Sequence, residues 1–282
     1  AVLMEVLYSK YRRIFRDFKV LDRKCDIYIF RNYQEFLQMT RKPPGVGGFY
    51  MPGRYKLVTY HGMFGTTGDT SRVLAHEGCH LFQDLIGMFG PNRMQPRSPI
   101  WLIEGMAVLF EAAEIDLKRK KVRIRGVNRD RLVSLQQAIK SGRYIKLRNL
   151  MNTPHRAFGP LHYAHAGMLT YWLLCKAGRK YNIAYTEYIR IATGDPKRGM
   201  RPRRIRPVED FERLCKKYIG KSLDKIEKEW LRWVMKQKPE RLGVWRGRRF
   251  VSKQLRFEIE RPAAWRTIPD SKLHSCLLYT SP

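Results

Sequence analysis

The sequence has few acidic residues, no long apolar run and no regular cysteine pattern. Its 25 acidic residues stand against 56 basic ones over 282 residues, which gives a formal net charge of +31. No apolar stretch approaches the roughly 20 residues that a membrane-spanning helix needs, so we expect no transmembrane segment in this chain. The hydrophobic content of 44% and the aromatic content of 12% are ordinary for folded proteins and exclude a wholly disordered basic chain.

The cysteine pattern excludes two further classes of protein. An odd number of widely spaced cysteines without a CxxC pair fits neither a disulfide scaffold nor a structural zinc site built from cysteine pairs. We interpret the cysteines as buried free thiols. They are Cys25, Cys79, Cys175, Cys215 and Cys276.

The two ends of the chain are set aside from the fold prediction. The sequence begins at Ala1 without an initiator methionine, and we expect an upstream segment, including any signal peptide, to be missing. Residues 275–282 follow neither a helical nor a strand period, and we interpret them as a non-native tail.

Apolar periodicity predicts many helices and a few short strands, hence an α+β fold. Helices are expected at 3–18, 33–39, 71–86, 99–115, 129–140, 147–151, 162–176, 185–193 and within 208–234. Strands are expected at 26–30, in a hairpin over 48–60, over 118–126 and over 250–259. Asp69 or Thr70 is the expected N-cap of the helix at 71, and Ser98 that of the helix at 99. The predicted parts are a sheet-containing subdomain at 1–115, a mainly helical subdomain at 116–237 and the start of a β-rich segment at 238–274.

Two histidines one helical turn apart form the clearest chemical pattern. In the segment from Leu74 to His80, the imidazoles of His76 and His80 lie on one helix face and can bind one zinc ion. Glu77 lies about 100° round the helix from His76, so it can reach a water at the metal without binding the metal itself. This HExxH spacing predicts two ligands and a general base, with Cys79 as a packing residue. The alternative is a pair of hydrogen-bonded histidines on a half-buried helix.

A catalytic zinc ion also needs a third protein ligand. Glu104 is the best candidate because it stands in an apolar helix, where an unpaired carboxylate is costly to bury. Asp84, one turn beyond His80, could instead bind the metal or orient a histidine. The carboxylates that qualify are Asp84, Glu104, Glu111 and Glu114.

The spacing of these motifs resembles that of the gluzincin metallopeptidases. Glu104 follows His80 by 24 positions within Trp101-Leu102-Ile103-Glu104-Gly105-Met106-Ala107. This block is similar to the WLxEGxA block of the peptidase MA-like families, which include bacterial zinc peptidases of unassigned substrate. The resemblance implies a zincin, thermolysin-like domain with a small mixed or antiparallel sheet and an active-site helix. It also implies Zn²⁺ held by His76, His80 and Glu104, with Glu77 as the general base.

Two further segments fit the same resemblance. Tyr163-Ala164-His165-Ala166 is similar to the family's Tyr-x-x-small helix, in which the tyrosine donates a hydrogen bond to the oxyanion of the tetrahedral intermediate. His162 and His165 are rival donors, and a core tyrosine is the structural alternative for Tyr163. The hairpin Phe49–Tyr60 fits the edge strand along which such zincins lay an extended substrate.

These residues predict a zinc-dependent metallopeptidase that acts on a peptide or protein substrate. The segment 71–115 has three basic and five acidic residues, whereas 116–150 has twelve basic and two acidic ones, so an acidic substrate is expected. A basic nucleic-acid-binding or catalytically inactive protein on a zincin fold is the alternative, but no RNP, KH, zinc-finger or bZIP signature supports nucleic-acid binding. Related peptidases are often exported or associated with the cell envelope, and we expect the same here.

Overall fold

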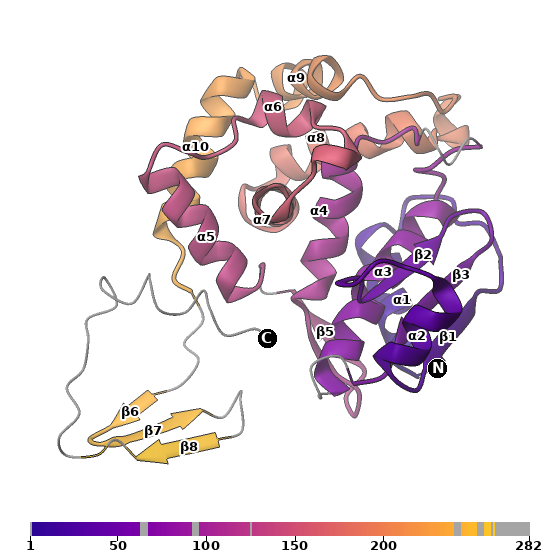
Figure 1. The fold of residues 1–282 in the computed structure, drawn as a ribbon. Helices are drawn as coiled ribbons and strands as arrows, with labels where there is room; N and C mark the ends of the chain where they lie inside the picture. The colour runs from indigo at the N-terminus through magenta and orange to yellow at the C-terminus, as the bar shows by residue number, and fades with distance from the viewer. Residues whose placement is uncertain are drawn as a thin grey trace. The chain divides into compact units, whose positions relative to one another are not determined.

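The structure is a computed structural model, which describes residues 2–62, 67–91, 96–124, 126–239, 244–252, 257–260 and 262. The chain divides into two compact units, Ala1–Gln237 and Lys238–Pro282. Over its described residues, the first unit combines ten α-helices with two small sheets, so the fold class is α+β (Figure 1). The predicted boundary at residue 115 stays a prediction, and the predicted tail at 275–282 lies outside the described residues.

A three-stranded sheet with the order β1-β3-β2 forms one side of the first unit. The central strand β3 (Lys56–Tyr60) pairs in parallel with β1 (Asp26–Phe30) and antiparallel with β2 (Gly48–Met51), so the predicted hairpin is present. Side chains alternate between the faces of a strand. Val58 and Tyr60 of β3 therefore pack against Phe36 on one face, and this residue belongs to α2 (Tyr33–Thr40).

Helix α3 (Thr67–Leu85) packs against β2 and β3, and it carries both histidines of the predicted zinc site. Helix α1 (Val2–Ile14) packs against α3. The hydroxyl of Tyr11 on α1 donates a 2.9 Å hydrogen bond to the backbone carbonyl of Ala75 on α3. A Cβ at Gly78 would lie 2.6 Å from the terminal methyl of Met4, so any larger residue there would require the Met4 side chain to move. The predicted caps Asp69 and Thr70 are wrong, since the helix already begins at Thr67.

Helices α4 (Ile100–Glu111) and α7 (Pro160–Tyr171) approach each other closely at two glycines. A Cβ at Gly105 would lie 2.6 Å from the carbonyl oxygen of Ala166, and one at Gly167 would lie 2.4 Å from Val108. The absence of these side chains lets the two backbones pack directly against one another. Figure 1 shows α7 end-on, with α4 on one side and α5 on the other.

The predicted ends of α4 need two corrections. The helix has no side-chain cap, so the predicted N-cap role of Ser98 is wrong. The helix also ends at Glu111 rather than at 115, because Glu114–Asp116 (β4) pairs with Lys121–Arg123 (β5) in an antiparallel hairpin. Pairing with a later strand satisfies backbone groups that the helix would otherwise use.

The other helices of the first unit surround α7 and build the core. They are α5 (Arg129–Lys140), α6 (Leu147–Asn152), α8 (Arg179–Thr193), α9 (Pro207–Tyr218) and α10 (Leu223–Lys236), with short 3₁₀ turns at His155–Ala157 and Pro196–Arg198. The predicted helical region 208–234 is thus two helices, separated at Gly220, whose φ of 77° suits glycine. Trp101 and Trp230 are among the largest fully buried side chains of the core.

The second unit contains a β meander within its described residues. Strands β6 (Val244–Arg246), β7 (Arg249–Ser252) and β8 (Phe257–Glu260) pair antiparallel in that order. A β-rich segment was predicted in this part of the chain. Across the described parts of both units, no helix has the length and apolar character to cross a membrane.

The cysteines follow the prediction only in part. Cys79 and Cys215 are free and buried, as predicted, whereas Cys25 is half-buried and Cys175 is exposed. Cys175 lies beyond the end of α7, where the chain leaves the core, so the prediction of burial was wrong there. Cys276 lies outside the described residues.

Candidate metal centre

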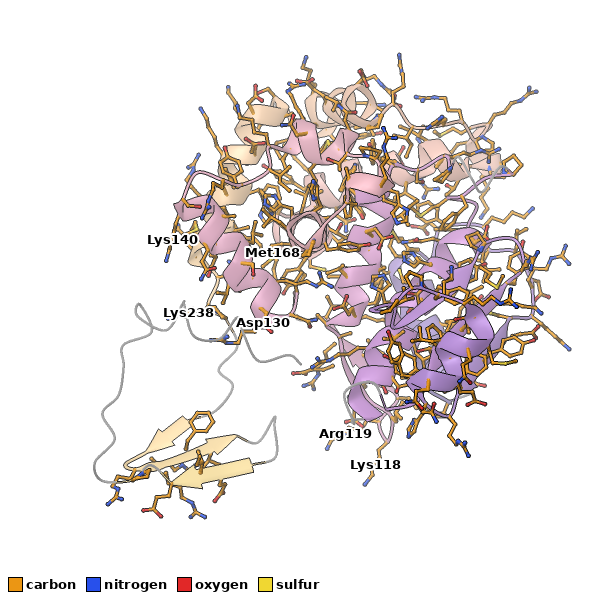
Figure 2. The ribbon with its side chains drawn as sticks, in the orientation of Figure 1. Lys118, Arg119, Asp130, Lys140, Met168 and Lys238 are labelled. Carbon is orange, nitrogen blue, oxygen red and sulfur yellow. The ribbon has the colours of Figure 1, made fainter. Side chains whose placement is uncertain are left out.

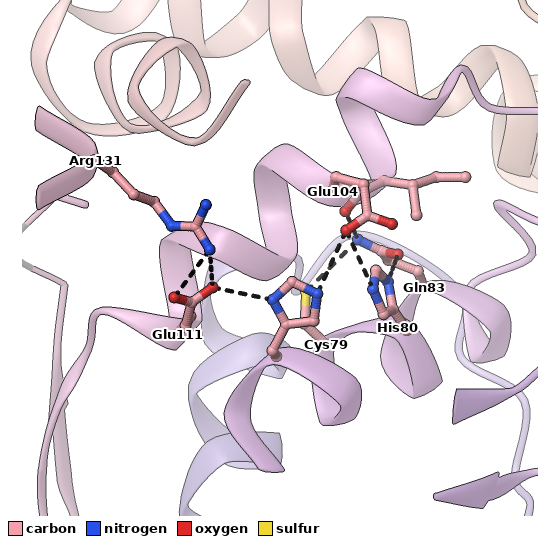
Figure 3. A network of polar contacts seen from close by, with 8 residues as sticks. Cys79, His80, Gln83, Glu104, Glu111 and Arg131 are labelled. Atoms are coloured by element: carbon pink, nitrogen blue, oxygen red, sulfur yellow. Dashed lines mark hydrogen bonds and ion pairs between the residues drawn. The ribbon is translucent and has the colours of Figure 1, made fainter. Parts of the chain in front are cut away.

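His76 and His80 of α3 meet Glu104 of α4 at one point. Each residue offers one ligand atom, and these atoms all lie within 4.8 Å of one another. Oε2 of Glu104 is 3.4 Å from Nε2 of His76 and 3.6 Å from Nε2 of His80 (Figure 3). Among the described residues, this is the only group of three or more such side chains that could hold a metal ion. The three ligands predicted from the sequence are therefore the three that the fold brings together.

The carboxylate of Glu104 lacks the hydrogen bonds that a buried anion needs. Its residue is 7% exposed, and Oε2 is buried without a hydrogen-bond partner. The two histidine nitrogens face it at ion-pair distances, which are too long for good hydrogen bonds. An orphaned buried carboxylate oxygen costs considerable free energy, and a bound cation removes that cost. The donor set of two imidazoles and one carboxylate suits zinc.

The pKa values of this cluster show that its carboxylates favour a positive charge among them. Burial disfavours a protonated His76, yet Glu104 and Glu111 raise the pKa of His76 to about 10. Burial likewise favours a neutral Glu104, but the charges of His80 and His76 hold the pKa of that carboxyl well below its usual range. Without a metal, the histidines of the cluster therefore hold protons more tightly than free histidine does. A bound cation would supply the same positive charge.

Gln83 determines which nitrogen of His80 faces the cluster. Its side-chain NH₂ donates a 2.7 Å hydrogen bond to the carbonyl oxygen of Ile103, so its oxygen is the atom that lies 3.0 Å from Nδ1 of His80 (Figure 3). Nδ1 of His80 must then carry the hydrogen, and in the neutral ring Nε2 keeps its lone pair for a metal. Cys79 is a buried packing residue, as predicted, and its sulfur lies 3.6 Å from the same NH₂ group.

Glu111 has the corresponding role for His76. Its Oε2 lies 3.3 Å from Nδ1 of His76, which leaves Nε2 directed at Glu104. Arg131 contacts both oxygens of Glu111, at 3.2 and 3.1 Å, and Asn128 donates a 2.8 Å hydrogen bond to Oε1. The carboxylate is thus fixed by α5 and the residue before it, and in turn it fixes the imidazole.

The sequence identified Glu111 as a candidate ligand but not as the partner of His76. It did not identify Gln83, Asn128 or Arg131. Glu111 follows Glu104 by seven residues, which is two turns of one helix face, so its approach to the same site was visible in the spacing. Gln83 follows His80 by three residues and lies on the same face of α3. No local spacing connects Arg131 to the site, because α5 reaches it only through tertiary packing.

The other carboxylates that qualified as ligands lie elsewhere. Asp84 accepts hydrogen bonds from the hydroxyl of Tyr50 at 2.9 Å and from the backbone of Gly53 at 2.8 Å. It thereby ties the turn of the β2–β3 hairpin to α3. Glu114 is an exposed residue of β4. Neither residue belongs to the group at Glu104.

Glu77 lies beside the cluster with an uncommitted carboxylate. The residue is half-buried and makes no hydrogen bond or ion pair with any other described side chain. Glu77 directly follows His76 on α3, and its negative charge helps to raise the pKa of His76 and of His80. This is the placement expected of a base that approaches the metal without binding it.

Tyr163 of α7 lies near the same acidic group, beside the arginine that binds Glu111. Its half-buried ring packs edge-on against Phe158, with centroids 5.0 Å apart, and the guanidinium of Arg131 lies 5.5 Å from its centroid. Burial and the charge of Glu104 raise the pKa of Tyr163 to about 12, against the opposing effect of Arg131. The phenol is therefore protonated at neutral pH and can donate a hydrogen bond.

The two rival donors lie in different surroundings. Nδ1 of His162 accepts the backbone N–H of Gly159 at 3.2 Å, at the start of α7. His165 is fully buried against Trp230, and burial lowers the pKa of His165 to about 3. Neither histidine shows an electrostatic effect of Glu104 on its pKa. Of the three candidates, Tyr163 is the one whose pKa is raised by the charge of Glu104.

The chain is similar to one family of proteins over part of its length. A family model described as a protein of unknown function, DUF1570, matches residues 71–191. No match is found among the curated proteins. The matched residues are less than half of the chain, but they include the three candidate ligands, Glu77, Glu111 and Tyr163. Over its whole candidate metal centre, the chain is therefore similar to a family whose function is unknown.

Proposed function

We propose that this protein is a zinc metallopeptidase of the gluzincin type on a zincin fold. The observation that carries the proposal is the buried, unpartnered Oε2 of Glu104, which faces Nε2 of both His76 and His80. In the part of the chain that the structure describes, the group has three members. Three protein ligands are typical of catalytic zinc, which keeps a coordination position for water, whereas structural zinc usually has four.

The residues around the ligands support hydrolysis by an activated water. Zinc, when bound, lowers the pKa of a coordinated water and polarises the carbonyl group of the substrate. Glu77 accepts the proton of the attacking water and delivers it to the leaving amine. The hydroxyl of Tyr163 donates a hydrogen bond to the carbonyl oxygen as negative charge develops on it. Glu111 and Gln83 hold the two imidazoles in the required tautomer.

The sheet offers a place for an extended substrate. Strand β2 is an edge strand and packs beside α3, which carries the two histidines. An extended peptide can add to such an edge through backbone hydrogen bonds. We therefore propose a peptide or protein as the substrate, and the basic segment 116–150 favours an acidic one.

Metal analysis and two substitutions test this function. The purified protein should contain about one zinc per chain, and His80→Ala should lose the metal. Glu77→Gln should keep the zinc and lose peptide hydrolysis by roughly 10²- to 10⁴-fold, because only the base is removed. A peptide library with matched acidic and neutral members identifies the preferred substrate. A zinc-free wild type would contradict the metal centre, and an active Glu77→Gln variant would contradict the assignment of the base.

A further inference from the structure

The guanidinium group of Arg131 lies at the edge of the candidate metal centre. Its Nη2 is 3.2 and 3.1 Å from the two oxygens of Glu111, and Glu111 in turn contacts His76 (Figure 3). Cζ of Arg131 also lies 5.5 Å from the ring centroid of Tyr163. One side chain therefore contacts both the partner of a proposed ligand and the ring of the proposed oxyanion donor.

Two of the three guanidinium nitrogens of Arg131 are not used by these contacts. Nη2 makes both contacts with Glu111, whereas Nη1 and Nε have no hydrogen-bond or ion-pair partner among the described residues. Neither atom belongs to the buried polar atoms that lack a partner, so both are accessible to solvent. Nη1 carries two N–H donors and Nε carries one, and these donors can bind a further acceptor.

Solvent exposure increases from the centre of the cluster toward Arg131. The side chain of Glu104 is 9% exposed, those of His76 and Glu111 are 16% exposed, and that of Arg131 is 26% exposed. The cluster is therefore more open on the side of Arg131 than on the side of Glu104. A substrate that approaches the cluster from this more open side meets the guanidinium group.

The start of α5 adds positive potential on the same side. Asn128 precedes the helix, but its amide donates to Glu111 and its side chain does not cap the helix. The first backbone N–H groups of α5 therefore have no side-chain acceptor, and this end of a helix carries a partial positive charge. Arg131 lies in this first turn, so the helix strengthens the attraction of its side chain for an anion.

We infer that Arg131 binds a carboxylate group of the substrate next to the scissile bond and thereby selects acidic peptides. Arginine binds carboxylates through charge-assisted hydrogen bonds. The carboxylate lies near the scissile bond because Tyr163, the proposed partner of the carbonyl oxygen, is beside the guanidinium group. Glu77 and Glu104 repel an acidic substrate, and the charge of Arg131 offsets that repulsion. The inference rests on the proposed peptidase function and names the residue that selects the substrate.

Three peptides of equal length distinguish the two sources of such a carboxylate. The first has a central glutamate and blocked ends, the second has glutamine in its place, and the third is the glutamine peptide with a free C-terminus. Their dissociation constants are measured by calorimetry on the whole chain carrying Glu77→Gln, which lacks the proposed base. At least one carboxylate peptide should bind about tenfold more tightly than the neutral one. Equal binding of all three peptides would overturn the inference.

Substitutions of Arg131 in the same background identify the residue responsible for this preference. Arg131→Gln should reduce the preference for the carboxylate peptide to less than about twofold, and Arg131→Lys should retain part of it because the charge remains. Loss of the contact with Glu111 affects all three peptides alike, so the ratio of their dissociation constants reports only on the carboxylate. A full preference in Arg131→Gln would refute the assignment.

Lys140→Gln is the matched control on the same helix. Figure 2 shows Asp130 and Lys140 at opposite ends of α5, and Lys140 is exposed. Its loss should change the preference by less than about twofold, because screening weakens distant surface charges. If Lys140→Gln lowers the preference as much as Arg131→Gln, the protein attracts acidic peptides only by its net charge, and the role of Arg131 is refuted.

Hydrolysis by the wild type separates this inference from the proposed function. A preference that depends on Arg131, without hydrolysis of any peptide, would support the carboxylate site and contradict the peptidase. Hydrolysis of acidic and neutral peptides with equal kcat/KM would support the peptidase and overturn the role of Arg131.

Discussion

The side-chain oxygen of Gln83 lies 3.0 Å from Nδ1 of His80, and the same side chain donates a hydrogen bond to Ile103. Ile103 directly precedes Glu104, so one buried amide connects the helix of two proposed ligands to the helix of the third. The two polar groups of the Gln83 side chain have different roles. The oxygen orients the imidazole, and the NH₂ group holds α3 and α4 together.

Substitutions at Gln83 should separate these two consequences. Gln83→Leu removes both contacts and should lower zinc affinity by about 10- to 100-fold, the usual effect of losing the partner of a ligating histidine. Gln83→Glu keeps an acceptor for Nδ1 of His80 but cannot donate to the carbonyl of Ile103. It should retain zinc affinity within a few-fold of the wild type while its melting temperature falls. Zinc affinity is measured by competition with a chelator of known affinity.

The comparison also separates an orienting role from a purely structural one. If Gln83 had only a structural role, Gln83→Glu would weaken zinc binding at least as much as Gln83→Leu. The reason is that the buried carboxylate would then face the carbonyl oxygen of Ile103. His80→Ala shows the affinity of a centre that has lost a ligand. If Gln83→Leu binds zinc like the wild type, Gln83 does not orient His80, and the metal centre itself is unaffected by that result.

Tyr163 should act on the rate of hydrolysis and not on metal binding. Tyr163→Phe removes only the hydroxyl, and we expect kcat to fall by about 10²- to 10³-fold with zinc content unchanged. Because the pKa of Tyr163 is raised to about 12, the phenol stays protonated through the alkaline range in which the wild type is assayed. His162→Gln is the matched control on the same helix and should leave kcat near that of the wild type. The opposite ranking of the two variants would make His162 the donor.

Local spacing explains why part of the site was predictable. His76 and His80 are one turn apart on a helix, so their shared face follows from the sequence alone. Glu104 was identified because a carboxylate in an apolar helix needs a partner, and Oε2 of Glu104 is indeed buried and unpartnered. These two inferences use only helix geometry and the cost of burying charge.

Non-local packing explains what the sequence did not reveal. Gln83 bonds to Ile103 twenty residues away, and Arg131 reaches Glu111 across the same distance. The early end of α4 has the same cause, because β4 pairs with β5 in place of a further helical turn. In each case the partner is chosen by the tertiary fold, so periodicity over a short window could not predict it.

His165 should make the stability of the fold depend on pH. Burial lowers the pKa of His165 to about 3 in the folded protein, whereas in an unfolded chain it is about 6.5. Between these values only the unfolded chain takes up the proton, so the free energy of unfolding decreases as the pH falls from about 6.5 toward 3. From pH 7 to pH 5 this residue should remove about 2 kcal/mol.

Urea unfolding at pH 7 and pH 5 measures this effect. His165→Gln cannot titrate, so its free energy of unfolding should change less between the two pH values than that of the wild type, by about 2 kcal/mol. Loss of a bound metal at low pH affects both proteins alike and cancels in the difference. An equal pH dependence in the two proteins would show that His165 is not held neutral by burial.

Gly105 should be required for the contact of α4 with α7 and for the position of Glu104 beside it. A Cβ at Gly105 would lie 2.5 Å from Oγ1 of Thr170 and 2.6 Å from the carbonyl oxygen of Ala166, and the latter is backbone that cannot turn aside. Gly105→Ala should therefore lower the free energy of unfolding by about 1–3 kcal/mol and weaken zinc binding as α4 shifts. Gly159→Ala is the matched control, since a Cβ at that position meets nothing within 4 Å. Chemical unfolding and zinc competition are measured for both variants. A Gly105→Ala variant as stable as Gly159→Ala would contradict this packing.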